Sequence, residues 1–122
     1  RRIFFNEELL TFADFNREHK RCLSFLKDAV SCSKARRKIV VTHHVPSFQM
    51  QCPKFADSQA NSAFTVELEE YIKNSGIDYW IFGHSHYNVD VKIGNTNCVS
   101  NQLGYVFHGE HESFNPGKYI EV

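Results

Sequence analysis

One segment indicates the architecture of this chain most directly: Asp78-Tyr79-Trp80-Ile81-Phe82-Gly83-His84-Ser85-His86. Its apolar and aromatic residues form an unbroken run, which is typical of a strand buried in a parallel or mixed sheet. Gly83 and two histidines follow the run at once. In open α/β sheets, ligand crevices form where such strands end. The segment therefore predicts a buried strand that delivers histidines into a crevice.

A second segment has the same design: Lys38-Ile39-Val40-Val41-Thr42, followed by His43-His44. This β-branched run shows no alternation, so we expect a strand that is covered on both faces. Both histidine clusters should then face one crevice. His84 and His86 are one residue apart, so extended backbone would direct both imidazoles to the same side, and Gly83 would let the chain turn without a Cβ in the way.

Two helices are expected. The first runs from about Asp14 and ends before Ser31, because His19, Leu23, Leu26 and Val30 recur at helical spacing. Eight basic residues lie between Arg17 and Lys38. Such a run is more typical of the solvent-exposed face of a helix than of a phosphate-binding patch. Asn61 or Ser62 can cap the second helix, which should stop at Gly76.

The remaining strands lie near the C-terminal end of the sequence. Residues 89–93 alternate, Gly94-Asn95 supplies a two-residue turn, and residues 96–100 can return as the second strand of a hairpin. Residues 119–122 can form one more strand. Residues 45–60 hold two prolines without periodicity and should form a loop that is functional or mobile. The expected fold is a layered α/β sandwich half-domain with a mixed sheet, two helices and a C-terminal β-hairpin.

Composition limits the possible functions. The 122 residues, of 14.2 kDa, fit one domain. Fourteen basic and fourteen acidic residues give zero net charge, so nucleic acid is not indicated as a partner, and neither is an anionic membrane. No apolar stretch is long enough to span a bilayer, and the first apolar run is too short for a secretory signal. Four scattered cysteines without a C-x-x-C pair indicate reduced thiols and a cytoplasmic location.

The histidine clusters can be interpreted in two ways. Neutral imidazole is a ligand for Zn, Mn or Fe, but an isolated H-x-H is more often a pair of ordinary surface histidines. Two clusters that each follow an apolar strand favour a metal site. His19 is expected to pack on a helix or to be solvated, and His108 and His111 should lie on the surface.

Two motifs resemble a known family. Residues 40–46, Val-Val-Thr-His-His-Val-Pro, and residues 80–86, which contain G-H-x-H, are similar to the last two motifs of calcineurin-like metallophosphoesterases. The order of helices, motifs and hairpin also agrees, so the resemblance covers nearly the whole chain.

The resemblance implies a site and a reaction. His43 and His84 would bind one metal and His86 a second, while His44 and Asn88 would contact substrate. No catalytic residue is implied beyond the metal ligands. The reaction would be hydrolysis of phosphate monoesters or diesters by a metal-activated water at a binuclear centre of Mn, Fe or Zn. Polar loop residues are candidates for lining the substrate pocket: Ser47, Gln49, Gln51, Lys54 and Tyr87.

The sequence also departs from the family pattern. It has no D-x-H pair, no G-D pair and no G-N-H motif. Residues 1–122 would therefore be the C-terminal part of one metallophosphoesterase domain. By itself this chain should hold at most one metal, should be inactive, and should associate with its missing N-terminal half or with itself. Two alternatives stay open: a non-catalytic scaffold of the same fold, and a zinc-binding interaction domain.

Overall fold

The computed structural model describes residues 3–5, 7–55 and 57–122. The chain divides into two units, Arg1–Lys34 and Ala35–Val122, and each is described by itself. The second unit carries all the histidines of the two clusters, so it receives most of the description.

The first unit consists of a small hairpin and one long helix. Strands β1 (Phe4–Phe5) and β2 (Glu8–Leu9) pair antiparallel; the sequence did not indicate this hairpin. Helix α1 (Phe12–Cys32) begins two residues earlier than expected and continues through Ser31 and Cys32. Its start is fixed by a capping box, in which the Thr11 hydroxyl accepts from the Asp14 N–H and the Asp14 carboxylate accepts from the Thr11 N–H.

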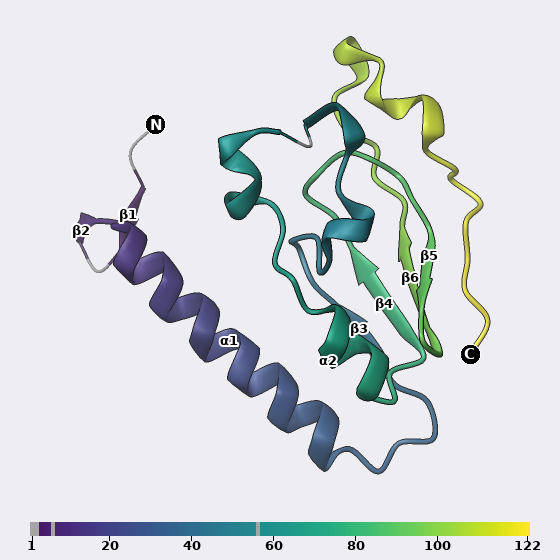
Figure 1. The fold of residues 1–122 in the computed structure, drawn as a ribbon. Helices are drawn as coiled ribbons and strands as arrows, with labels where there is room; N and C mark the ends of the chain where they lie inside the picture. Colours follow the sequence, from purple (N-terminus) through teal and green to yellow (C-terminus); the bar gives the residue numbers. More distant parts are fainter. Residues whose placement is uncertain (1–2, 6, 56) are drawn as a thin grey trace. The chain divides into compact units, whose positions relative to one another are not determined.

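The second unit is built on a four-stranded mixed sheet. Its strands are β3 (Ile39–Val41), β4 (Tyr79–Phe82), β5 (Val91–Ile93) and β6 (Thr96–Ser100), in the spatial order β3-β4-β6-β5 (Figure 1). Strands β3 and β4 are parallel, as are β4 and β6, whereas β5 and β6 form the antiparallel hairpin. The mixed α/β architecture and the hairpin are thereby confirmed.

One face of this sheet is covered by the core. Val40, Trp80, Phe82 and Cys98 all lie buried on it. The alternate residues of β3 are exposed, Ile39 by 43% and Val41 by 71%. The expectation that this strand is covered on both faces was therefore wrong. Because successive side chains of a strand point to opposite faces, a run of three apolar residues here supplies only one residue to the core.

The second helix is shorter than expected. Helix α2 (Glu69–Asn74) begins well after Asn61 and Ser62, whose segment forms a 3₁₀ helix at Gln59–Ala63. Thr65 instead pairs with Val45 in a parallel bridge, in which the N–H of Val45 donates to Phe64 O and the N–H of Val66 donates to Val45 O. Pairing with a distant segment thus overrode local helical preference. The predicted stop is confirmed, since α2 ends before Gly76, where φ is +68°.

The segments outside the sheet and helices are partly ordered by short helices. The loop at 45–60 contains 3₁₀ helices at Phe48–Met50 and Pro53–Phe55, and Met50 is fully buried. Residues 119–122, which the structure describes, form no strand; the C-terminal segment instead runs beside the sheet (Figure 1). Among the described residues, no helix combines the length and the apolar character that crossing a bilayer requires.

Candidate metal centre

Two parallel strands bring the histidine clusters together. Val41 of β3 lies opposite Ile81 of β4. The ladder continues past both strands, because the Thr42 N–H donates to Ile81 O at 2.9 Å and the Gly83 N–H donates to His43 O at 3.1 Å. Since parallel strands end at the same edge of a sheet, this register places the residue after each strand beside its counterpart.

His43 and His84 are in direct contact. Nε2 of His43 lies 2.8 Å from Nδ1 of His84, and their ring centroids are 4.6 Å apart. Two imidazole nitrogens that bind the same tetrahedral Zn²⁺ at about 2.0–2.1 Å lie about 3.3 Å apart. The pair would share one metal ion once the two nitrogens move apart by about 0.5 Å. This is the first part of the predicted donor set.

The surroundings of His84 favour the form that binds metal. Burial lowers the pKa of His84 below 6.5, and the charges of His44, His43 and His86 act in the same direction. The ring also faces Phe64, with centroids 4.6 Å apart. Because burial penalises the imidazolium, His84 keeps a free lone pair near neutral pH.

His44 lies beside this pair. Its ring centroid is 4.7 Å from that of His84 and 5.3 Å from that of His43. Its carbonyl accepts from the Thr42 hydroxyl, which holds the turn after β3. The position agrees with the expected contact to substrate, which stays a prediction.

The backbone of the G-H-x-H segment differs from the expected extended form. His84 has φ of 71° and His86 has φ of 52°, both in the left-handed region that residues other than glycine rarely adopt. A Cβ on Gly83 would meet its nearest neighbours at 3.6 and 3.8 Å, which are ordinary contacts. The turn therefore does not depend on an open space at Gly83. Two histidines carry the strained conformations instead, each at a cost of about 1–2 kcal/mol.

His86 has an acidic partner. Its Nδ1 lies 2.8 Å from Oε2 of Glu110, and its ring meets that of Tyr105 edge-on with centroids 4.8 Å apart. The backbone N–H of Tyr105 also donates to Glu110, and this bond is the main cause that lowers the pKa of Glu110. Glu110 is accordingly a carboxylate that touches a predicted metal ligand.

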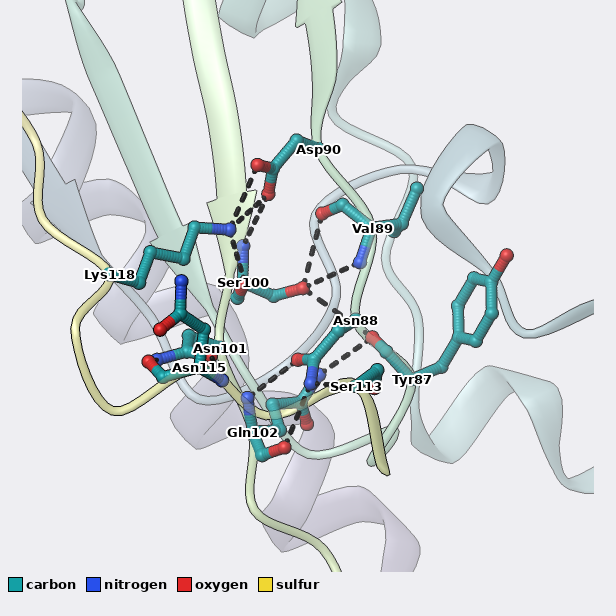
Figure 2. Close-up of polar contacts among 10 residues, drawn as sticks. All are labelled: Tyr87, Asn88, Val89, Asp90, Ser100, Asn101, Gln102, Ser113, Asn115 and Lys118. Atoms are coloured by element: carbon teal, nitrogen blue, oxygen red, sulfur yellow. Dashed lines mark hydrogen bonds and ion pairs between the residues drawn. The ribbon is translucent and has the colours of Figure 1, made fainter. Parts of the chain in front are cut away.

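Asn88 is part of a network that supports His86. Its amide accepts from the Gln102 N–H and donates to Gln102 O and to the Ser113 hydroxyl (Figure 2). The Gln102 side chain in turn accepts the N–H of His86 at 2.8 Å. The expected role of Asn88 toward substrate stays a prediction. Its three hydrogen bonds give it a structural role that the sequence did not indicate.

Glu110 and Gln102 were missed in the sequence. Neither belongs to a motif, and Glu110 lies in a loop whose His108 and His111 are exposed, as expected. Both reach the histidines through contacts that span 16 and 24 residues. No local pattern signals contacts of that range.

The donor set within this chain is incomplete. In residues 3–5, 7–55 and 57–122, no group of three or more His, Cys, Asp or Glu side chains is arranged to hold a metal ion. His43 and His84 fit one ion as a pair, and His86 is held separately by Glu110. Further ligands would have to complete any site.

The chain matches known proteins along most of its length. The model of the calcineurin-like phosphoesterase family matches residues 3–88. Uncharacterized protein L509 of Acanthamoeba polyphaga mimivirus is 29% identical over 120 residues, covering 93% of this chain and 41% of the viral protein. The chain thus spans about two fifths of the length of that relative. No solved structure matches the chain significantly. The family match includes both histidine clusters and most of the chain, and the chain belongs to the calcineurin-like phosphoesterase family.

Proposed function

We propose that this chain supplies the histidine-bearing part of a metal-dependent phosphoesterase that hydrolyses phosphate monoesters or diesters. The observation that carries the proposal is the contact between His43 and His84, 2.8 Å apart at the ends of two parallel strands. Their family generally uses divalent metals. A bound divalent metal supplies positive charge for the phosphoryl oxygens and activates the attacking water.

Within this proposal, each residue has a role that its surroundings support. His43 and His84 bind one metal ion (Mn, Fe or Zn), and His86 binds a second metal ion. His44, beside the pair, meets the substrate. Unprotonated rings are needed for metal binding, which the partial burial of His84 favours.

The chain alone is expected to hold at most one ion and to be inactive. Two divalent ions about 4 Å apart repel by roughly 17 kcal/mol at an effective dielectric constant of about 20. Neutral imidazoles bring no charge to offset this repulsion. A carboxylate between the two ions is required, and the described residues place none with His43 and His84.

We also propose that β3 marks the surface where the rest of the domain docks. It is the outer strand of the four-stranded sheet, and its side chains Ile39 and Val41 are exposed. An open strand edge with apolar side chains favours pairing with another chain segment. We expect self-association of the chain alone, measured by analytical ultracentrifugation, and its reversal when the remaining part is co-expressed. Monomers at high concentration contradict this docking.

A direct experiment tests the activity. Hydrolysis of p-nitrophenyl phosphate and bis(p-nitrophenyl) phosphate is measured with Mn²⁺ for the 122-residue chain and for the protein made from the full coding sequence. We expect turnover only in the longer protein, with loss in His84→Ala and retention in His111→Ala. Turnover by the short chain, lost in His84→Ala, contradicts the expected inactivity of the chain.

One observation favours a second candidate, a non-catalytic scaffold of the same fold. Among the described residues, no three His, Cys, Asp or Glu side chains are arranged to hold a metal ion. The coding sequence upstream separates the candidates, because an enzyme requires carboxylates in the D-x-H, G-D and G-N-H motifs and a scaffold does not. A longer protein that has these motifs and binds metal, yet hydrolyses neither substrate, excludes the phosphoesterase proposal for these ester classes.

A further inference from the structure

Glu110 contacts His86 from a segment outside the family match, which ends at residue 88. Its Oε2 lies 2.8 Å from Nδ1 of His86 and accepts the Tyr105 N–H at 2.6 Å. A glutamate carboxyl is ordinarily ionised near neutral pH, because its usual pKa is about 4.3. An ionised carboxylate can only accept hydrogen bonds. Nδ1 of His86 must therefore carry the proton in this contact.

We propose that Glu110 is a positioning residue that holds His86 in its Nδ1–H tautomer and leaves Nε2 free to bind a divalent metal. A histidine that binds metal through one nitrogen usually donates from the other to a carboxylate or carbonyl, which fixes the ring and increases the basicity of the bound nitrogen. The part of this inference that concerns metal rests on the proposed function. The part that concerns the tautomer does not.

Gly104 provides independent support, because it makes the approach of Glu110 possible. Its φ is +64°, and a Cβ there would lie 2.5 Å from Cβ of Glu110 and 2.9 Å from its Oε2. The same Cβ would lie 3.3 Å from Cβ of His86. Only glycine leaves room for the two side chains to meet at this point.

The segment that carries Glu110 is fixed to the sheet by a C-terminal clasp, which we define as Asn88, Asp90, Asn101, Ser113, Asn115 and Lys118. Asn101 donates to Asn115 O at 2.8 Å and accepts the Asn115 N–H at 2.9 Å. Lys118 binds both carboxylate oxygens of Asp90 and the carbonyl of Ser100 (Figure 2). Asn88 holds Ser113, at the end of the short helix Glu110–Ser113. These bonds hold the residues that follow Glu110 in the sequence against the sheet and the loop beside it.

The same residues line a polar cavity of about 400 Å³. Three of these side chains already form hydrogen bonds: Asn88 with Gln102 O, Asn101 with Asn115 O, and Lys118 with the Asp90 carboxylate. A ligand would have to displace these bonds, so we assign the network to anchoring the loop.

The test compares metal-free variants of the 122-residue chain, and then the same variants of the protein made from the full coding sequence with Zn²⁺ alone. Glu110→Ala removes the acceptor, and Glu110→Gln keeps an oxygen acceptor of the same length. Glu112→Ala is the matched control, because it removes a carboxylate from the same short helix. Among the described residues, Glu110 of this helix forms an ion pair and Glu112 does not. The tautomer of His86 is determined from long-range ¹H–¹⁵N correlations at about pH 8.5, where an ordinary imidazole is neutral. Zn²⁺ affinity is measured by calorimetry.

We expect the Nδ1–H tautomer in the original chain, in Glu110→Gln and in Glu112→Ala, and a mixture of tautomers in Glu110→Ala. In the longer protein, Zn²⁺ affinity at the second metal site should fall 10–100-fold in Glu110→Ala and should be unchanged in Glu112→Ala. Gly104→Ala should reproduce the tautomer mixture. If Glu110→Ala keeps a pure Nδ1–H tautomer, the positioning role is overturned.

Failure of this inference, for the tautomer of His86 or for its metal, can be told apart from failure of the proposed function. A changed tautomer with unchanged Zn²⁺ affinity overturns the role toward metal and leaves the positioning role. If the longer protein binds no second Zn²⁺, the proposed metal at His86 fails, while the tautomer comparison in the metal-free chain still decides whether Glu110 positions His86. Should Glu110→Ala not fold, Gly104→Ala and Glu110→Gln provide the comparison, and identical tautomers in both overturn the proposal.

Discussion

Nε2 of His43 lies 2.8 Å from Nδ1 of His84, although 41 residues separate them in the sequence. The contact is a product of sheet register. Val41 lies opposite Ile81, and the hydrogen bonds that follow continue that pairing into the two histidine segments. A shift of β3 by one residue would turn its side chains to the other face and separate the pair. Whatever fixes the register of β3 against β4 therefore also fixes the candidate metal centre.

Removing either member of this pair should weaken metal binding. We expect His43→Ala and His84→Ala to lower Zn²⁺ affinity at least tenfold, because each removes half of the contact at 2.8 Å. His111→Ala, an exposed histidine of the C-terminal segment, is the control and should bind as the original chain does. Calorimetry should also give at most one Zn²⁺ per chain. Two ions bound per chain, or full affinity in His84→Ala, contradicts this assignment.

Much of this arrangement could be predicted from the sequence, because it depends on local patterns. Apolar runs that end in histidines predicted β3, β4 and the edge where they meet. Gly94-Asn95 predicted the hairpin. The pairing of Val45 with Thr65 was not predictable, because a bridge between distant segments replaced the expected start of the second helix. Glu110 was missed for the same reason, since only the folded chain brings it to His86.

The hydroxyl of Thr42 should contribute measurably to stability. It accepts the indole N–H of Trp80 at 2.9 Å and donates to His44 O at 3.0 Å, and Trp80 is fully buried. Thr42→Val keeps the shape but leaves the indole N–H unsatisfied, so we expect a loss of about 1–3 kcal/mol in the free energy of unfolding. Trp80 is the only tryptophan, so its fluorescence reports urea unfolding directly.

Thr42→Ser is the matched variant for this test. It keeps the hydroxyl and removes only a methyl group, so its loss of stability should be clearly smaller. Equal stability of Thr42→Val and the original chain would show that the hydrogen bond to Trp80 contributes nothing net.

The hairpin turn and α2 should be coupled through Gly94. A Cβ at Gly94 would lie 3.2–3.3 Å from atoms of Lys73 in α2, and φ there is +59°. Gly76 has a similar φ of +68°, but the described atoms leave the space around its Cβ open. Gly76→Ala should therefore lose about 1–2 kcal/mol through backbone strain alone. Gly94→Ala should lose more, because α2 must also shift. Equal losses in thermal unfolding contradict the predicted contact.

Asp78 should make the stability of the fold depend on pH in the acidic range. It should also help to fix the register of β3 against β4, which positions the histidines. Its carboxylate accepts the Lys38 N–H at 2.8 Å and binds Arg37 at 2.7 Å, where β3 and β4 begin. The bond from Lys38 is the main cause that lowers the pKa of Asp78, followed by the bond from Arg37. The unfolded chain therefore binds the proton more readily than the folded chain does. The contribution of Asp78 is complete above the ordinary aspartate pKa of about 3.9 and is lost as pH falls through the lower folded pKa.

Asp78→Asn should consequently have a lower melting temperature than the original chain near pH 7, and the two melting curves should converge as pH falls below about 4. The same variant should weaken Zn²⁺ binding at neutral pH, because loosening the start of both strands disturbs the register that ends at His43 and His84. Asp28→Asn removes an exposed carboxylate on α1 and controls for the change in net charge. A difference in melting temperature that stays constant down to about pH 2 would mean that Asp78 is not a stabilising carboxylate, and that the register of β3 against β4 is held by the strands alone.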